Sequence, residues 1–252
     1  MPKSILYAFV LSFLASISTI IGSFIIFFDK RKSSRVVAYS LSFAAGVMIC
    51  VSLTDLLPNA YKMIMWYKDS FLKLLFTLIF MVIGIIISMI IDKYVPDYES
   101  KENRGLYKIG IISMVAIILH NIPEGIATFI TSSNNLKLGI TLTIAIALHN
   151  IPEGISIAVP IYHATNNKIK AILYSLISGM SEVLGSIVAY FFLKPIMNDS
   201  IMASLYAIIA GIMVHISIYE LLPTSYKNGT LKVVLKGLII GFVIMMISHI
   251  LL

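Results

Sequence analysis

The chain has 252 residues, of which 59% are hydrophobic and only 12% are charged, and its mean hydropathy is +0.96. Soluble globular domains carry roughly 25% charged residues, so this composition excludes a soluble protein and predicts an integral membrane protein. The formal net charge of +7 does not indicate nucleic acid binding, because the placement of the basic residues follows the rule that orients membrane proteins.

Eight apolar stretches are long enough to cross a bilayer, whose core of about 30 Å needs a helix of roughly 20 residues. They lack the alternating pattern of a membrane barrel, so we expect one all-α domain over residues 1–252. The first stretch continues to Phe28, beyond the apolar region of a secretory signal, and is expected to remain as a span. The expected spans are about 5–28, 36–57, 71–91, 107–131, 137–161, 169–192, 200–222 and 233–251.

The basic residues predict the orientation of these spans, because cytoplasmic connections are enriched in Lys and Arg. Placing the connection between spans one and two in the cytoplasm leaves only Lys3, Lys62, Lys68, Lys73, Lys137 and Lys194 outside. The other basic residues then lie inside: Lys30, Arg31, Lys32, Arg35, Lys93, Lys101, Arg104, Lys108, Lys168, Lys170, Lys227, Lys232 and Lys236. With an even number of spans, both termini are extracytoplasmic in a multi-pass protein of the cell membrane.

Two internal repeats relate these spans. Residues Ala45–Pro58 reappear at an offset of 165 residues as Ala210–Pro223, and spans four and five repeat at an offset of 29 residues. In the predicted orientation the members of each pair cross the membrane in opposite directions. The chain is therefore expected to have inverted repeats in a 3+2+3 arrangement, which is typical of secondary transporters that work by alternating access. Asp55 is expected near the external end of span two and Glu220 near the cytoplasmic end of span seven. One acid would then lie at each mouth of the transport pathway.

The hexapeptide His-Asn-Ile-Pro-Glu-Gly occurs in the middle of both span four and span five. Residues three and four apart share a helix face, so each copy presents an imidazole, an amide oxygen and a carboxylate as one polar stripe. This mixture of nitrogen and oxygen suits zinc and other divalent first-row metals, whereas calcium and magnesium prefer oxygen alone. Two facing stripes predict a site for one or two ions, formed by His120, Asn121, Glu124, His149, Asn150 and Glu153.

The same motif contains residues that alter the helix backbone. Pro123 and Pro152 each remove a hydrogen bond and push against the carbonyl group four residues earlier, so a kink or break is expected at both. Helices interrupted at membrane depth are tolerated where they line a cavity, and freed carbonyl groups can coordinate a cation. Gly125 and Gly154 are expected to let spans four and five approach each other closely.

Other polar residues in the spans are candidates for the same pathway. Glu182 lies in the middle of span six, and together with Asp55, Glu124, Glu153 and Glu220 it makes five acids in or at the ends of spans, with no Lys or Arg deep enough to neutralise them. Ionised acids without cations would be very unfavourable there. Protons or metal ions must therefore occupy the site.

The remaining candidates carry weaker signals. His215 is a candidate for the metal path, although its counterpart in the repeat is Cys50, the one cysteine. His163 and His249 fall at a loop and at the terminus and are assigned no role. Gly237 and Gly241 form a GxxxG pattern in span eight, which is a weak indication of a helix contact or a dimer face.

On these residues the chain resembles the ZIP (Zrt/Irt-like protein) family of divalent metal transporters, in particular its bacterial zinc uptake members. The resemblance rests on both hexapeptides, on Ser181-Glu182, and on the acid-Leu-Leu-Pro sequences at Asp55–Pro58 and Glu220–Pro223. It implies an eight-helix fold in which spans one, four, five and six move as a unit against the other four. It also implies that the chain can form a homodimer. It also implies zinc as the transported substrate rather than a cofactor, with iron, manganese and cobalt as alternatives.

The resemblance further implies how the ligands divide between two metal sites, with glutamates bridging. The first would be formed by His120, Glu124, His149 and Glu153, and the second would be formed or bordered by Asn121, Glu124, Asn150, Glu153 and Glu182. Many family members have a His-rich loop between spans three and four, but the connection from Asp92 to Leu106 contains no His. Metal sensing by this loop is therefore not expected.

Two other functions compete with metal uptake. A proton-coupled carrier of another solute would use the His and Glu residues as a proton relay, which explains the acids but not the asparagines. An intramembrane metalloprotease would need His-Glu-x-x-His, in which two His bind zinc and the Glu acts as base. Neither hexapeptide has the second His, so the protein is not expected to be an enzyme.

Overall fold

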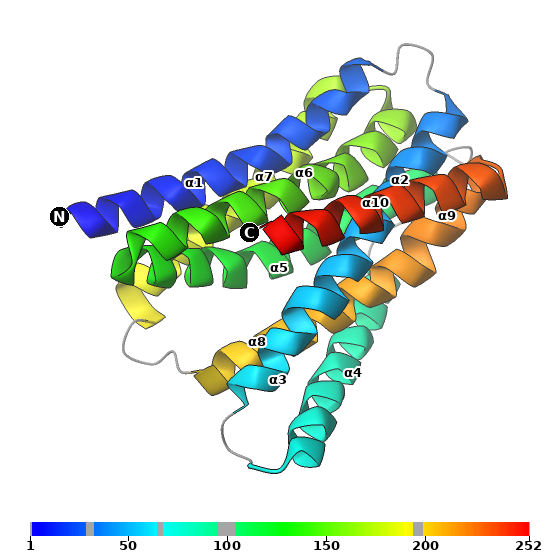
Figure 1. Cartoon of the computed structure of the whole chain (residues 1–252). Coiled ribbons are helices and arrows are strands. Elements are labelled where there is room, and N and C mark those ends of the chain that lie inside the picture. The colour runs from blue at the N-terminus through cyan, green and yellow to red at the C-terminus, as the bar shows by residue number, and fades with distance from the viewer. Residues whose placement is uncertain (1, 29–32, 65–67, 95–103, 194–198, 252) are drawn as a thin grey trace.

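The computed structural model describes residues 2–28, 33–64, 68–94, 104–193 and 199–251, and eight of its helices are long and apolar enough to cross a membrane (Figure 1). This confirms the predicted all-α, eight-span membrane fold. The helices are α1 (Lys3–Ser23), α2 (Ser34–Val51), α3 (Leu57–Met63), α4 (Ser70–Tyr94), α5 (Arg104–Asn134), α6 (Leu136–Thr165), α7 (Lys168–Val188), α8 (Asp199–Ile216), α9 (Leu222–Asn228) and α10 (Leu231–Leu251).

Two of the eight spans are each built from two helices joined by a wider, π-helical turn. The turn Ser52–Leu56 joins α2 to α3, and the turn Ser217–Leu221 joins α8 to α9. In each case a proline follows in the first turn of the second helix, where its missing N–H group costs little. The predicted ends of these spans, at residues 57 and 222, were therefore too early.

Asp55 and Glu220 lie inside the π-helical turns, each with a further seven-residue helix beyond it.

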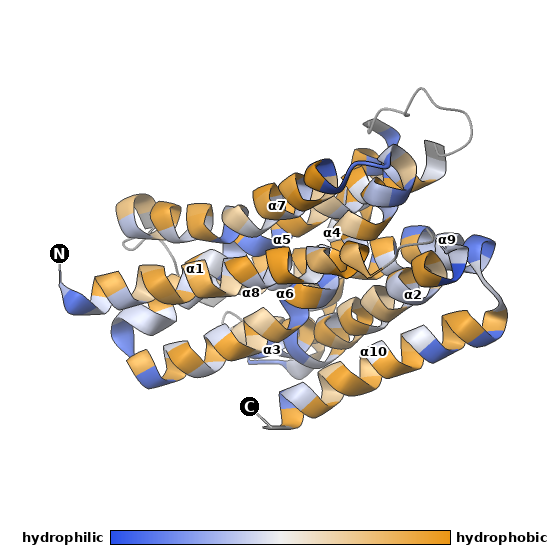
Figure 2. Cartoon of the chain, turned by 90° about the horizontal axis from the view of Figure 1, so that it is seen from above, coloured by the Kyte–Doolittle hydropathy of each residue, from blue (hydrophilic) through white to orange (hydrophobic). Residues whose placement is uncertain are grey.

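The prolines of the hexapeptides do not break their helices. Pro123 lies inside the unbroken α5, and Pro152 lies inside the unbroken α6. Of the two alternatives expected at these positions, the break was wrong, while the kink stays a prediction. The neighbouring helices explain why a continuous helix is tolerated, because both segments are packed on several sides by other spans. Apolar residues dominate along the helices and hydrophilic residues gather at helix ends and inside the bundle (Figure 2).

Glycines bring helices into backbone contact within two separate groups of spans. In the first group, a Cβ atom added to Gly22 of α1 would overlap the carbonyl oxygen of Ile151 in α6, and one added to Gly185 of α7 would overlap that of Ile122 in α5. In a bilayer, helix association depends on close packing because lipid tails are as apolar as the side chains. Gly179 of α7 lies in the same way against the Ser16 backbone of α1, so these contacts join α1, α5, α6 and α7 in one group.

The second group shows the longer inverted repeat in its packing. A Cβ atom at Gly46 of α2 would overlap the Leu238 carbonyl oxygen of α10, and one at Gly211 of α8 would overlap the Met81 carbonyl oxygen of α4. Gly46 and Gly211 are related by the 165-residue offset. The pair α2 and α10 is thus packed as the pair α8 and α4 is. The π-helical turn after α8 packs on α2, and the π-helical turn after α2 packs on α8, so these four helices form the second group.

The glycines of the hexapeptides contact other helices than those expected, whereas those of span eight make one of the two kinds of contact expected. Gly125 lies against the Glu182 backbone of α7, and Gly154 lies against the Thr19 backbone of α1. The prediction that these two glycines bring α5 and α6 together was therefore wrong. Gly237 and Gly241 pack on the α2 backbone, so the GxxxG pattern serves a helix contact within the chain.

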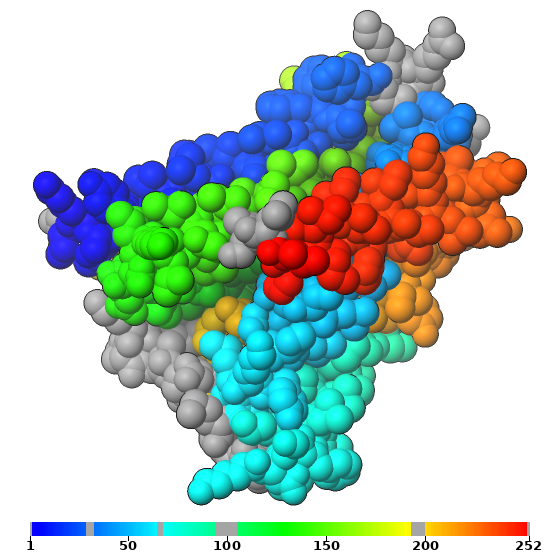
Figure 3. Space-filling view, in the orientation of Figure 1, coloured from blue at the N-terminus to red at the C-terminus, as the bar shows by residue number. Residues whose placement is uncertain are grey.

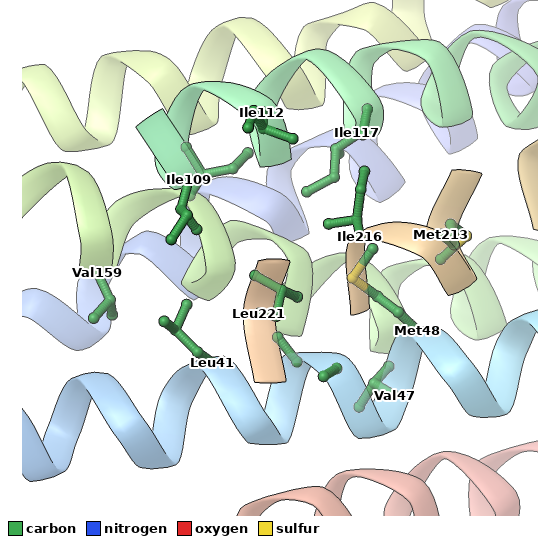
Figure 4. Packing of buried hydrophobic residues seen from close by; sticks show 14 of the residues in the cluster. Leu41, Val47, Met48, Ile109, Ile112, Ile117, Val159, Met213, Ile216 and Leu221 are labelled. Atoms are coloured by element: carbon green, nitrogen blue, oxygen red, sulfur yellow. The ribbon is translucent and has the colours of Figure 1, made fainter. Parts of the chain in front are cut away.

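A buried apolar cluster fills the space where the two groups meet (Figure 4). Its side chains point toward one another from α2, α5, α6, α8 and the π-helical turn before α9. The labelled members are Leu41, Val47, Met48, Ile109, Ile112, Ile117, Val159, Met213, Ile216 and Leu221. Dense packing of this kind leaves few voids as large as a water molecule.

Some predictions concern residues whose structure is not described. Lys30, Arg31, Lys32, Lys101 and Lys194, which contributed to the predicted orientation, lie outside the described residues. The same holds for residues 95–103, which make up most of the connection without His.

The glycine contacts predict opposite effects for two Gly→Ala substitutions. Gly211→Ala is expected to destabilise the protein by about 1–3 kcal/mol, because the added methyl group overlaps backbone that cannot give way. Gly105→Ala is the control, since a Cβ atom there meets nothing within 4 Å, and it is expected to stabilise α5 by up to about 1 kcal/mol. Thermal unfolding in detergent micelles measures both, and equal effects of the two substitutions would contradict this packing.

Candidate metal centre

Helices α5 and α6 bring two histidines and a glutamate into one buried cluster. The Nε2 atom of His149 lies 2.8 Å from Oε1 of Glu124, and the Nε2 atom of His120 lies 3.0 Å from the same oxygen. One ligand atom from each residue lies within 4.8 Å of the other two, and all three side chains are buried. Among the described residues this is the group of His, Cys, Asp and Glu whose spacing suits a metal ion.

Glu153 completes the pairing of the two hexapeptides. Its Oε1 atom lies 3.5 Å from Nε2 of His120, and its side chain is 1% exposed. The imidazole rings of His120 and His149 are neighbours, with centroids 5.9 Å apart and planes inclined by 46°. Each stripe therefore contributes one imidazole and one carboxylate to a common centre, as the helical spacing of the motif predicts.

The two asparagines attach the hexapeptides to the helices behind them. The Nδ2 atom of Asn121 donates to the Ser178 carbonyl oxygen of α7 at 3.2 Å, and that of Asn150 donates to the Ala15 carbonyl oxygen of α1 at 3.1 Å. Asn150 also donates to Oε2 of Glu182 at 3.1 Å. With both amide nitrogens used in this way, each asparagine keeps its oxygen as the group available to a cation.

The two hexapeptides are thus attached by equivalent contacts. In each copy the amide of the Asn donates to a carbonyl group, the carbonyl group of the Ile meets a glycine, and the Gly meets a backbone carbonyl. Helix α5 makes these contacts with α7, and α6 makes them with α1. The short inverted repeat therefore extends to α7 and α1, the helices that pack against α5 and α6. Thr19 lies at the position in α1 that Glu182 occupies in α7.

Many of the buried polar atoms at this centre have no hydrogen-bond partner. Buried polar atoms in proteins are almost always paired, and an unpaired one costs roughly 1–3 kcal/mol. A group of unpaired nitrogen and oxygen atoms in one place is what a cation site without its cation would contain. The unpaired atoms are Nδ1 of His120, Oδ1 of Asn121, Oε2 of Glu124, Oδ1 of Asn150, Oε2 of Glu153 and Oε1 of Glu182.

A cavity leads to this cluster from the side on which Asp55 lies. It has a volume of about 380 Å³ and is lined by Asp55, Asn59, Glu124, His149 and, from α10, His249 among others. Nδ2 of Asn59 donates to Oδ1 of Asp55 at 2.6 Å. The lining elements surround a recess in the face shown in Figure 3, between the green α6, the cyan α3 and the red end of α10. Asp55 therefore lies at a mouth that reaches the centre.

The opposite mouth is separated from the centre. Glu220 lines a different cavity of about 390 Å³, together with Lys108 and Lys227, and none of the hexapeptide residues lines it. The apolar cluster that includes Ile112 and Leu221 lies among the helices on this side. The structure brings Asp55 and the cluster together and keeps Glu220 apart from them.

His215 lies away from the cluster. Its Nδ1 atom is 2.9 Å from Oγ of Ser88 in α4, and its ring stacks on that of Tyr219 at 4.9 Å. The contacts of this histidine are with the second helix group. By contrast, His249, which the sequence analysis assigned no role, lines the cavity to the centre. Its place near the terminus gave no signal, since only the packing of α10 on α2 turns it toward Asp55.

Comparison with known proteins agrees with this architecture. The profile of the family described as "ZIP Zinc transporter" matches residues 3–108 and 97–249. A zinc transporter ZupT of Clostridium perfringens is 41% identical over 98% of this chain and 96% of its own length, and one of Campylobacter jejuni is 40% identical over the same two shares. A zinc transporter ZupT of Streptococcus mutans is 39% identical over 98% of each chain. The chain therefore belongs to the ZIP family, whose members are membrane transporters rather than enzymes.

Proposed function

We propose that this protein takes up divalent metal into the cytoplasm, with zinc as the first substrate and iron, manganese and cobalt as alternatives. The observation that carries the proposal is the buried cluster of His120, Glu124 and His149, whose ligand atoms lie within 4.8 Å of one another. Nitrogen and carboxylate ligands in this combination suit zinc. Relatives named as zinc transporters over nearly the whole chain support the same substrate.

The centre has enough ligand atoms for two ions. One ion would be held by the two histidines with Glu124 and Glu153, and the second by the oxygens of Asn121, Asn150 and Glu182 together with the same glutamates. The unpaired oxygens of the asparagines and of Glu182 support the second position. Because each asparagine is anchored through its nitrogen, its oxygen would reach the ion without a further change of rotamer.

Transport would proceed by alternating access between the two mouths. The cavity that joins Asp55 to Glu124 and His149 gives the centre one open side, and the apolar cluster closes the other. With the orientation predicted from the basic residues, this is the outward-facing state. Movement of α1, α5, α6 and α7 against α2, α4, α8 and α10 would then carry the ion, because the close backbone contacts of the described glycines all lie within one group or the other.

Replacing ligands of the cluster is expected to abolish zinc uptake. Glu124→Ala and His149→Ala should each reduce the uptake of radiolabelled zinc into proteoliposomes by more than about tenfold, because even indirect supports of a metal ligand affect affinity by that factor. His163→Ala is the matched control and should transport normally, because His163 lies on α6 with His149 but outside the cluster. If the two ligand variants took up zinc as fast as the unmodified protein, the proposal would be contradicted.

The metal content of the purified protein separates this function from the proton-coupled carrier. Mass spectrometry should find one or two zinc ions per chain, with fewer in the Glu124→Ala variant. A metal-free protein after zinc loading would instead favour a proton relay, which needs the acids but not the anchored asparagines.

The accessibility of introduced cysteines tests the outward-facing state. In a Cys50→Ala background, Thr141→Cys in the cavity wall should react with a membrane-impermeant thiol reagent added outside. Ile117→Cys, buried in the apolar cluster, should react far more slowly. Labelling of Thr141→Cys from the cytoplasmic side alone, or equal rates at the two positions, would contradict the proposed state.

A further inference from the structure

Three basic side chains converge where α2 and α10 begin. Arg35 lies in the first turn of α2, and Lys232 and Lys236 lie in the first turns of α10. The two helices are in close contact along this stretch, since a Cβ atom at Gly237 would overlap the Ser42 side chain and lie close to the Tyr39 backbone. The side chains of all three basic residues are exposed.

These residues line two adjoining hollows. One has a volume of about 380 Å³ and the other about 510 Å³, and Arg35, Val233 and Lys236 line both. Lys232 adds a third cation to the larger hollow. No acidic side chain is among the described residues that line either one. The hollows therefore present three positive charges with hydroxyl groups nearby and no carboxylate to balance them.

The arrangement of the cations favours an anion. Lys232 and Lys236 are four residues apart on one helix, where like charges repel and destabilise the helix, and Arg35 faces the same space from α2. A bound anion would relieve this repulsion. Arg is well suited to a phosphate group, which its planar guanidinium can bind through two parallel hydrogen bonds.

The surroundings favour a lipid over a free anion. Leu231, Leu235, Ile239 and Val243 form an exposed apolar row on α10 that starts beside the two lysines, so an acyl chain could follow it. The hollows also lie at the ends of two membrane spans, at the level of lipid headgroups. Basic pockets between helices at the cytoplasmic surface are suited to anionic headgroups.

We propose that Arg35, Lys232 and Lys236 bind the phosphate headgroup of an anionic phospholipid between α2 and α10. Ile25, which follows α1, lines the smaller hollow, so the lipid contacts both helix groups at their boundary. This site is remote from the hexapeptides, and it stands whether or not the transported ion is zinc.

The test compares lipid binding by a charge-neutralised variant and a matched control. The variant carries Arg35→Gln, Lys232→Gln and Lys236→Gln. The control carries Lys168→Gln and Lys170→Gln, which remove basic residues of the same predicted side that lie over the rings of Phe27 and Tyr107. If each charge that contacts the bound phosphate contributes a factor of about five in affinity, the triple variant should bind phosphatidylglycerol about 100-fold more weakly. The control should bind it as the unmodified protein does, because Lys168 and Lys170 line neither hollow.

Native mass spectrometry with added phosphatidylglycerol, phosphatidylcholine or inorganic phosphate measures the binding, and zinc content shows that each variant is folded. Retention of phosphatidylglycerol by the unmodified protein and the control, with loss from a zinc-loaded or normally eluting triple variant, supports the site. Three results overturn it: undiminished binding by the triple variant, equal binding of phosphatidylcholine, or displacement of the lipid by millimolar inorganic phosphate.

Discussion

The constraint on which the rest of this molecule depends is the burial of three glutamates in the middle of a membrane. Glu124, Glu153 and Glu182 are each at most 6% exposed, and their described close partners are two histidines and an asparagine rather than any Lys or Arg. Buried charges without partners are very costly. Protons or a cation must therefore neutralise them, and the unpaired nitrogen and oxygen atoms of the two hexapeptides and Glu182 gather at the same place.

The hexapeptide meets this constraint by dividing its residues between two tasks. His120, Glu124 and their repeats face each other across α5 and α6, while Asn, Ile and Gly of the same motif face backward onto α7 and α1. One short sequence thus sets both the candidate ligands and the contacts that hold their helices in position. Ligands need such support, because small displacements of a metal ligand are costly to affinity.

Much of this could be predicted from the sequence, because it depends on local spacing. Span length, the inverted repeats and the shared face of His120 and Glu124 follow from helix geometry alone. The sequence does not say which helix covers a face, so the partners of Gly125 and Gly154 were predicted wrongly. It also placed Asp55 at a helix end, because the proline three residues later is normally a stop signal, whereas a π-helical turn carries the helix past it. The role of α10 in turning His249 toward the cavity is a tertiary effect with no local pattern.

The central claim is that the histidines and glutamates of the two hexapeptides hold the transported metal. X-ray absorption at the zinc K edge of the zinc-loaded, purified protein tests it most directly. The account predicts only nitrogen and oxygen ligands at about 2.0–2.2 Å, with imidazole scattering that weakens in the His149→Ala variant. Zinc bound to sulfur at about 2.3 Å, or a spectrum that His149→Ala leaves unchanged, would contradict it.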